Sequence, residues 1–146
     1  KDFLFVMAGA GDMLDAMVAL AAKKRISENF FFTGFLQGEE LKRLLQMCDV
    51  YVMPSVSEPF GIAPLEAMGM GVPTIISRQS GVSEILKNVI KVDFWDIDAM
   101  ADAVYSIGRR KTLSAMLSER GKAEAGTITW DKAADKLKKI YSEMIH

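Results

Sequence analysis

Cysteine and histidine are almost absent from this chain, which has one of each among its 146 residues. A single cysteine excludes a disulfide framework, and one cysteine with one histidine predicts no metal cluster and no metal cofactor. The scarcity of cysteine fits a reducing compartment, so the sequence predicts a cytoplasmic location.

Strong charge of one sign and long apolar runs are also missing. The formal net charge is -1 at pH 7, which gives no electrostatic basis for a nucleic-acid partner or an anionic membrane surface. No apolar run is long enough to cross a bilayer, so no transmembrane segment is expected. With 50% hydrophobic and 25% charged residues, the composition predicts one globular domain over 1–146 with a full core.

Short apolar runs alternate with helical periodicity along most of the chain. Runs typical of buried strands cover 3–8, 30–33, 50–53, 74–77 and 89–92. Helices are expected over roughly 12–24, 39–47, 61–69, 82–87, 98–109, 112–124 and from 130 onward, with Asp12 as the cap of the first. This alternation predicts an α/β fold with a Rossmann-like, doubly wound parallel sheet flanked by helices.

The segment from Ser57 to Met68, Ser-Glu-Pro-Phe-Gly-Ile-Ala-Pro-Leu-Glu-Ala-Met, carries the clearest functional signal. It holds two glutamates, Glu58 and Glu66, with seven residues between them. Pro59 disfavours helical geometry at Glu58, which places Glu58 in a loop, whereas Glu66 lies about one turn into the following helix. Open α/β sheets bind phosphorylated ligands where a strand is followed by a short loop and the start of a helix, which is the arrangement predicted here. Taken alone, the glutamates could also be solvated carboxylates near the positive end of a helix.

Further sequence blocks stand in order around this segment. They are Ala8-Gly9-Ala10-Gly11, Phe32-Thr33-Gly34, Cys48-Asp49-Val50-Tyr51-Val52-Met53-Pro54-Ser55, Gly71-Val72-Pro73-Thr74-Ile75 and Ser80-Gly81-Val82-Ser83-Glu84. Together with the E-x7-E segment they resemble the C-terminal half of retaining GT-B glycosyltransferases of family 4 (group 1), over nearly the whole chain. The stretches Val92-Asp93-Phe94-Trp95-Asp96 and Ile128-Thr129-Trp130 are similar to glycogen- and starch-synthase-like members. The chain departs from the family at Ser80, where the family has the first of two glycines.

The resemblance implies a role for each residue of the segment. Glu58 would accept hydrogen bonds from hydroxyls of the donor sugar, and Glu66 from two ribose hydroxyls, since a carboxylate offers two acceptor oxygens. Phe60, Gly61 and Ile62 would bind donor oxygens through backbone N–H groups at the helix start, where Gly61 permits close approach because it has no Cβ. The alternative is an ordinary helix start without a ligand.

Two earlier turns are further candidates. By resemblance, Gly9 and Gly11 would line the edge of the donor site, and the alternative is a tight structural turn. Gly34, Phe35 and Leu36 would receive the nucleotide base through backbone groups and an apolar wall. The alternative is a hydrophobic plug under the next helix.

The resemblance implies the donor-binding half of an enzyme that moves a hexose from a nucleoside diphosphate sugar to an acceptor hydroxyl, without a cofactor. Its partners would be the nucleotide sugar and an N-terminal GT-B domain that holds the acceptor. This chain lacks that domain and the family's preceding strand with its diphosphate-binding Arg and Lys, so the chain alone is expected to be inactive. The alternatives are a domain of a GT-B nucleotide-sugar isomerase, such as a 2-epimerase, and a non-catalytic nucleotide-sugar-binding module.

Overall fold

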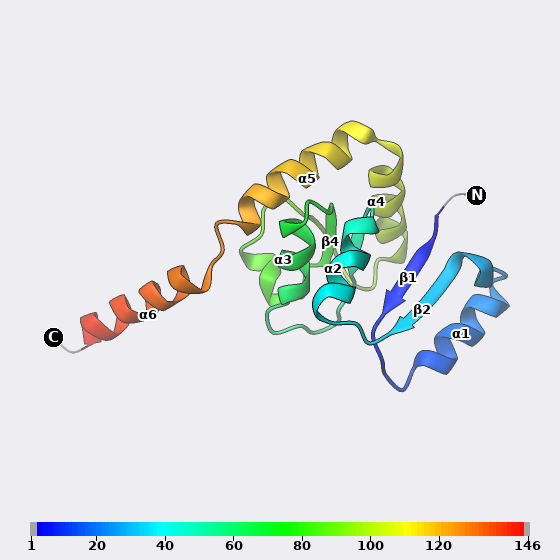
Figure 1. Ribbon diagram of the computed structural model, residues 1–146, viewed down its shortest axis with the longest axis horizontal. Helices are drawn as coiled ribbons and strands as arrows, with labels where there is room; N and C mark the ends of the chain where they lie inside the picture. The colour runs from blue at the N-terminus through cyan, green and yellow to red at the C-terminus, as the bar shows by residue number, and fades with distance from the viewer. Residues whose placement is uncertain (1–2, 145–146) are drawn as a thin grey trace. The chain divides into compact units, whose positions relative to one another are not determined.

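The computed structural model describes residues 3–144, and every pair of strands in that range is parallel. The chain folds into two compact units, of which the first ends at Leu44 and the second begins at Leu45. Strands and helices alternate along the chain until its last three elements, which are all helices (Figure 1). The predicted α/β class with parallel strands is confirmed, while one domain over 1–146 stays a prediction.

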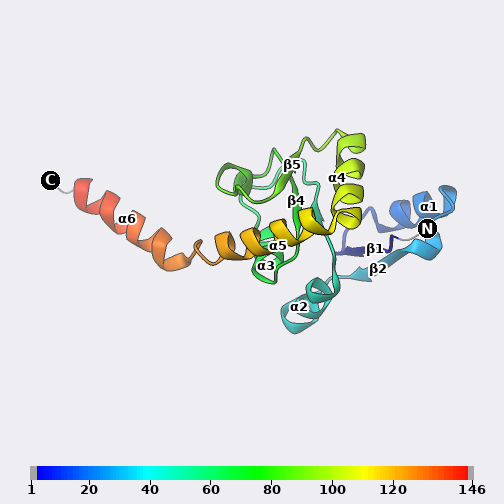
Figure 2. The same ribbon diagram turned by 90° about the horizontal axis from the view of Figure 1, so that it is seen from above.

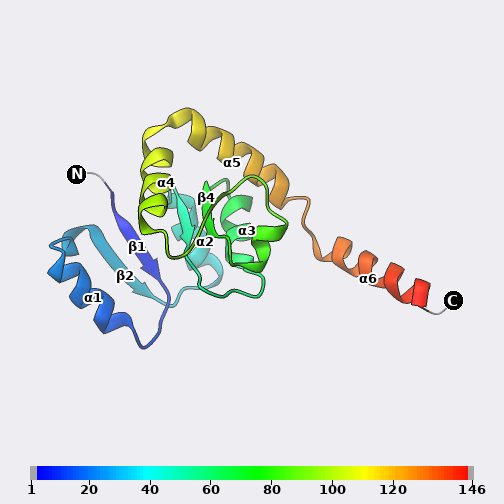
Figure 3. The ribbon, with the colours of Figure 1, turned by 180° about the vertical axis from the view of Figure 1, so that it is seen from behind.

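The first unit holds a two-stranded parallel sheet. Its elements are β1 (Phe5–Ala8), α1 (Leu14–Lys23), the 3₁₀ turn η1 (Ser27–Asn29) and β2 (Phe30–Gly34), and α2 (Gly38–Met47) runs from this unit into the second. α1 connects the two strands (Figure 3). The prediction that Asp12 caps α1 is wrong. Met13 is the N-cap residue, without a side-chain cap bond, because Asp12 lies in a turn one residue before the cap position.

The second unit is built on a three-stranded sheet with the order β3-β4-β5. Its elements are β3 (Tyr51–Met53), α3 (Ile62–Gly69), β4 (Thr74–Ser77), the 3₁₀ turn η2 (Gly81–Glu84), β5 (Ile90–Val92), α4 (Ile97–Arg109), α5 (Lys111–Ala125) and α6 (Trp130–Met144). The five strands of the described residues are thus divided between two sheets.

β4 is the central strand of the second unit, and all four of its residues are buried. Ile76 belongs to a cluster with Met68 of α3, while Ile75 belongs to a second cluster with Ile107 of α4 and Leu117 of α5. Successive side chains of a strand point to opposite faces, so the two isoleucines pack on opposite sides of the sheet. α5 runs past both α4 and α3 (Figures 1 and 2). Helices therefore cover this sheet on both faces, as predicted.

The segment after β4 differs from its predicted form. A helix over 82–87 was expected, but the structure has only the 3₁₀ turn η2. The amide of Ser83 donates to the carbonyl of Ser80 at 2.9 Å and that of Ile85 to Val82 at 3.2 Å, which is the tighter i to i−3 spacing. The chain therefore turns back at once beside the loop that precedes α3.

Between residues 3 and 144, no helix is both long and apolar enough to span a membrane.

Candidate functional site

The loop between β3 and α3 carries Glu58 and is paired with the segment after β4. Glu58 forms a parallel bridge with Ser80. The amide of Gly81 donates to the Glu58 carbonyl at 2.9 Å, and the amide of Val82 donates to the Phe60 carbonyl at 2.7 Å. Backbone pairing of this kind fixes the path of the loop through main-chain atoms, so the Glu58 carboxylate takes no part in the pairing.

A cavity of about 580 Å³ opens beside this loop. Its lining consists of Met53, Glu58, Pro59, Phe60, Gly61, Ile62, Ala63, Trp130 and Ala133. Four of the predicted site residues therefore come together, and Glu58 is the one ionisable side chain among the lining residues. Trp130 and Ala133 come from α6, and sequence reasoning assigned them no part in the site.

Gly61 is the N-cap residue of α3 and has a left-handed backbone, with φ +94°. A Cβ built at this position would lie 3.1 Å from Met53 Cε, 3.2 Å from Glu58 Cγ and 3.4 Å from a Val82 methyl. Both the dihedral angle and the crowding favour glycine. The helix start is therefore held close against the Glu58 side chain, because no side chain stands between them.

The amide of Phe60 does not stay open for a ligand in this structure. It donates to a carboxylate oxygen of Glu58 at 3.4 Å, a long bond. A carboxylate has two oxygens, so Glu58 can keep this contact and still accept from a sugar hydroxyl. Of the three amides predicted to bind donor oxygens, the amide of Phe60 is therefore already hydrogen-bonded to Glu58.

Glu66 lies exposed on α3 and is not part of the cavity lining. The charges of Glu66 and Glu58 both act on Tyr51 of β3, which is half-buried and packs beside the core cluster of Met53 and Met68. Burial, followed by the negative charges of Glu66 and Glu58, raises the pKa of Tyr51 to about 12. Both carboxylates therefore act on the same phenol. Sequence reasoning missed Tyr51 because a tyrosine in a strand fits an ordinary core position.

Cys48, the one cysteine, follows α2 and is half-buried. Burial, and secondarily the charge of Asp49, raises the pKa of its thiol. A thiol that keeps its proton is a poor nucleophile. Among residues 3–144, no group of three or more His, Cys, Asp or Glu side chains is arranged to hold a metal ion.

The remaining predicted residues lie in the first unit. The amide of Gly9 donates to the carbonyl of Gly34 at 2.8 Å, so the two predicted turns meet where β1 and β2 end. Gly9 has φ +144° and Gly34 has φ +72°, values that favour glycine, whereas Gly11 has no positive φ. Phe35 is 70% exposed, and Leu36 is half-buried. The exposed ring of Phe35 is not a buried plug in the structure, which leaves it open to a ligand or another surface.

The family model of glycosyl transferases group 1 matches residues 1–124. The chain belongs to the group 1 glycosyl transferases. The family prediction is confirmed at this level, and the narrower likeness to family 4 and to starch synthases stays a prediction.

Relatives and solved structures agree with this assignment. An uncharacterized glycosyltransferase of Bacillus subtilis is 31% identical over 126 residues, which are 84% of this chain and 35% of that protein. Sucrose-phosphate synthase of Thermosynechococcus elongatus superposes with a TM-score of 0.81 at 23% identity, over 97% of this chain and 38% of that one. HepE of Anabaena, in complex with UDP and glucose, superposes with a TM-score of 0.84 at 18% identity, over 94% of this chain and 40% of that one. The group 1 chain thus has the fold of a GT-B C-terminal half and spans little more than a third of these proteins.

Proposed function

We propose that this chain is the donor-binding half of a retaining glycosyltransferase that transfers a hexose from a nucleoside diphosphate sugar to an acceptor hydroxyl. Glu58 binds hydroxyls of the transferred sugar, and Glu66 binds the ribose. Gly61 and Ile62 offer backbone N–H groups at the start of α3 to donor oxygens. Gly9, Gly11, Gly34, Phe35 and Leu36 are proposed for the edge of the site and the base.

One observation carries the proposal: Glu58 lines a cavity beside the start of α3, and Glu66 stands eight positions later on that helix. Carboxylates suit sugar hydroxyls because they only accept, while hydroxyls donate. A helix start beside them supplies N–H donors and positive potential for phosphate oxygens. The two kinds of group match the two halves of a nucleotide sugar.

In the proposed reaction, the bond between the anomeric carbon and the departing phosphate oxygen breaks as the acceptor oxygen bonds to the same carbon on the same face. The acceptor proton passes to the departing phosphate, so the products are a glycoside and a nucleoside diphosphate. No side chain is assigned as a covalent nucleophile and no metal is required. The protein contributes positioning and stabilisation of the charge on the leaving group.

The acceptor site and the cationic groups for the diphosphate are proposed to lie outside these 146 residues. An anion at a helix N-terminus gains only about 0.3–1 kcal/mol without cationic partners. We therefore expect the chain alone to bind nucleoside diphosphate with a dissociation constant on the order of millimolar and to transfer no sugar. We also propose that the protein is located in the cytoplasm.

The test uses the complete gene product that carries this chain. UDP-, ADP- and GDP-sugars are first compared by thermal shift, because a ligand that binds only the folded state raises its stability. The stabilising donor is then incubated with candidate acceptors, and nucleoside diphosphate release and the anomeric configuration of the product are measured by NMR. Release of nucleoside diphosphate with retention is expected. Epimerisation of the sugar without release, or product with inverted configuration, would overturn the proposal.

A further inference from the structure

The residues 77–82, here named the clamp segment, lie against residues 54–61, the Glu58 loop. Three hydrogen bonds join the two segments. The Ser77 hydroxyl donates to the Ser55 carbonyl at 2.6 Å, and the amides of Gly81 and Val82 donate to the carbonyls of Glu58 and Phe60 at 2.9 and 2.7 Å. The loop is thus fixed near its start, at Glu58 and near its end.

Gly81 makes the closest approach between the two segments. A Cβ built on Gly81 would lie 2.0 Å from the carbonyl oxygen of Pro59 and 2.9 Å from its carbonyl carbon. Both atoms belong to the backbone, so they cannot rotate away as the end of a side chain can. Gly81 has no positive φ, so its backbone conformation is open to other residues. Position 81 therefore requires glycine because a side chain there would clash with Pro59, the residue next to Glu58.

The side chain of Ser80, the residue before Gly81, has a structural role in the clamp segment. It is 2% exposed, and its hydroxyl donates to the Ser77 carbonyl at 2.8 Å. This bond closes the turn inside the clamp segment. The close backbone contact with the Glu58 loop is kept at Gly81 even though Ser80 has a side chain.

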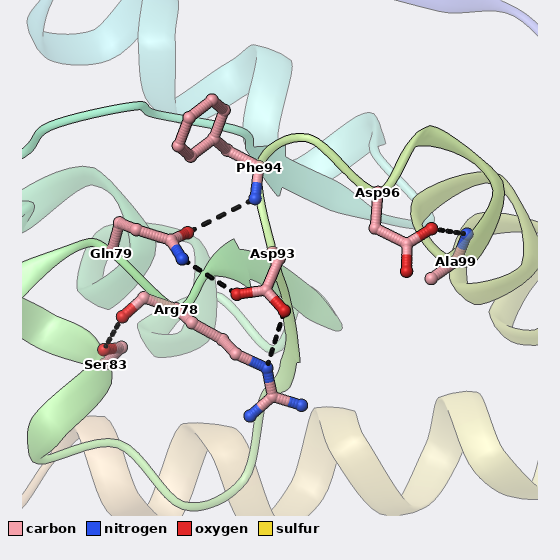
Figure 4. A network of polar contacts seen from close by, with 7 residues as sticks. All are labelled: Arg78, Gln79, Ser83, Asp93, Phe94, Asp96 and Ala99. Carbon is pink, nitrogen blue, oxygen red and sulfur yellow. Dashed lines mark hydrogen bonds and ion pairs between the residues drawn. The ribbon is translucent and has the colours of Figure 1, made fainter.

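The other side of the clamp segment is tied to the end of β5 (Figure 4). The side-chain amide of Gln79 donates to Asp93 at 2.8 Å, and its oxygen accepts from the Phe94 amide at 3.2 Å. Arg78 Nε lies 3.8 Å from the second oxygen of Asp93. The segment is therefore held between β5 and the Glu58 loop.

We propose that Ser77 and Gly81 are positioning residues that set the place of the Glu58 carboxylate through the loop backbone. The inference rests on the proposed function in one respect, the contact of Glu58 with the donor sugar. Displacement of Pro59 moves Glu58 and leaves the ribose and base contacts in place. A defect in the clamp segment therefore reduces recognition of the sugar more than recognition of the nucleotide.

The test compares Gly81→Ala with wild type in the complete gene product, using UDP and UDP-glucose as probes. Calorimetry gives the ratio of the two dissociation constants. We expect the preference for UDP-glucose to fall about tenfold, as for a lost hydrogen bond to a charged group, while UDP affinity changes no more than about twofold. Loss of folded protein lowers binding of both ligands equally and leaves the ratio unchanged. Gly69→Ala is the matched control, since Gly69 has no positive φ and its added Cβ would meet nothing within 4 Å.

Ser77→Ala is the second variant if Gly81→Ala does not fold, because it removes one of the three bonds without adding an atom. It should lower the ratio in the same direction. An unchanged ratio in the folded clamp variants, with a reduced ratio in Glu58→Gln, would overturn the clamp and leave the proposed function standing.

If wild type binds neither probe, the sugar nucleotide selected by the thermal-shift comparison and its nucleoside diphosphate take their place. If Glu58→Gln leaves the ratio of the bound pair unchanged, the proposed role of Glu58 fails. The clamp is then tested by hydrogen exchange of the Val82 amide. Its rate should rise at least about tenfold in Gly81→Ala as the bond to Phe60 opens. An unchanged rate would overturn the clamp independently of any ligand.

Discussion

Asn88 donates two hydrogen bonds to one carboxylate oxygen of Glu124, from its backbone amide at 2.8 Å and its side-chain amide at 3.0 Å. The other oxygen of Glu124 accepts from the Lys87 amide at 2.8 Å. Glu124 stands near the end of α5, so one carboxylate joins that helix to the turn that precedes β5.

Glu124→Ala should lower the free energy of unfolding by about 1.5–3 kcal/mol, because two backbone amides lose a charged acceptor. Urea denaturation measures the change. Glu124→Gln keeps one acceptor oxygen and should lose less. Glu119→Ala, at an exposed position of the same helix, serves as the control. Equal losses in Glu124→Ala and Glu119→Ala would show that the turn does not depend on this carboxylate.

Glu66→Ala in the complete gene product should weaken donor binding by about 1.5–3 kcal/mol, about tenfold to a hundredfold, if Glu66 accepts from two ribose hydroxyls. Its stability should hardly change, since the side chain is exposed. Calorimetry with the donor and with the free base separates the ribose contact from the rest. Donor affinity within about twofold of wild type would remove the ribose role.

Glu58→Gln should reduce turnover strongly and leave binding of the bare nucleoside diphosphate almost intact. The amide keeps the size of the carboxylate but loses its charge and one acceptor. Turnover rates and nucleoside diphosphate affinity are measured on the same preparation. Equal losses in both quantities would contradict a contact confined to the transferred sugar.

Gly61→Ala should weaken donor binding and lower stability by about 1–3 kcal/mol, because alanine is strained at a left-handed φ. The structure directs a Cβ at this position toward Met53 and Glu58. Gly71→Ala is matched for strain, with φ +80°, and its Cβ would meet Ser118 on α5. Donor affinity should fall only for Gly61→Ala, and an equal fall in both variants would point to general strain.

Tyr51 should make stability depend on pH in the alkaline range. The pKa of its phenol is raised from 10.0 to about 12 in the folded chain, so the neutral form is favoured there. Below pH 10 this contribution is fully present. As the pH rises toward 12, the unfolded chain releases the proton first, and up to about 2 kcal/mol of stability is lost. Urea midpoints against pH for wild type and Tyr51→Phe measure the difference. Parallel curves would show that Tyr51 has no part in the dependence.

Local patterns predicted the elements of the second unit closely. β4 was expected at 74–77 and is found at Thr74–Ser77, because a short β-branched run after Gly and Pro is typical of a buried strand. The start of α4 was placed at residue 98, but Asp96 accepts from the amide of Ala99 and the helix begins at Ile97. Helix ends depend on such side-chain bonds, which a period of apolar residues does not encode.

The relations between distant segments were harder to predict. Nothing in the pattern around Gly81 indicates that its Cα faces the Pro59 carbonyl, more than twenty residues earlier in the sequence. The clustering of Glu58, Gly61 and Ile62 could be predicted because these residues are neighbours in sequence. The position of Trp130 in the cavity lining and that of Tyr51 near the two glutamates depend on tertiary packing, so they could not be predicted from the sequence.

Because the thiol of Cys48 is half-buried and protonated, the natural cysteine contributes little unwanted reaction when the chain is labelled with thiol reagents. Maleimides react with thiolates, so the raised pKa of this single cysteine slows its modification. A second cysteine at the exposed end of α3, as in Gly69→Cys, would be labelled first. A fluorophore there would report arrival of a nucleotide without removal of the natural cysteine.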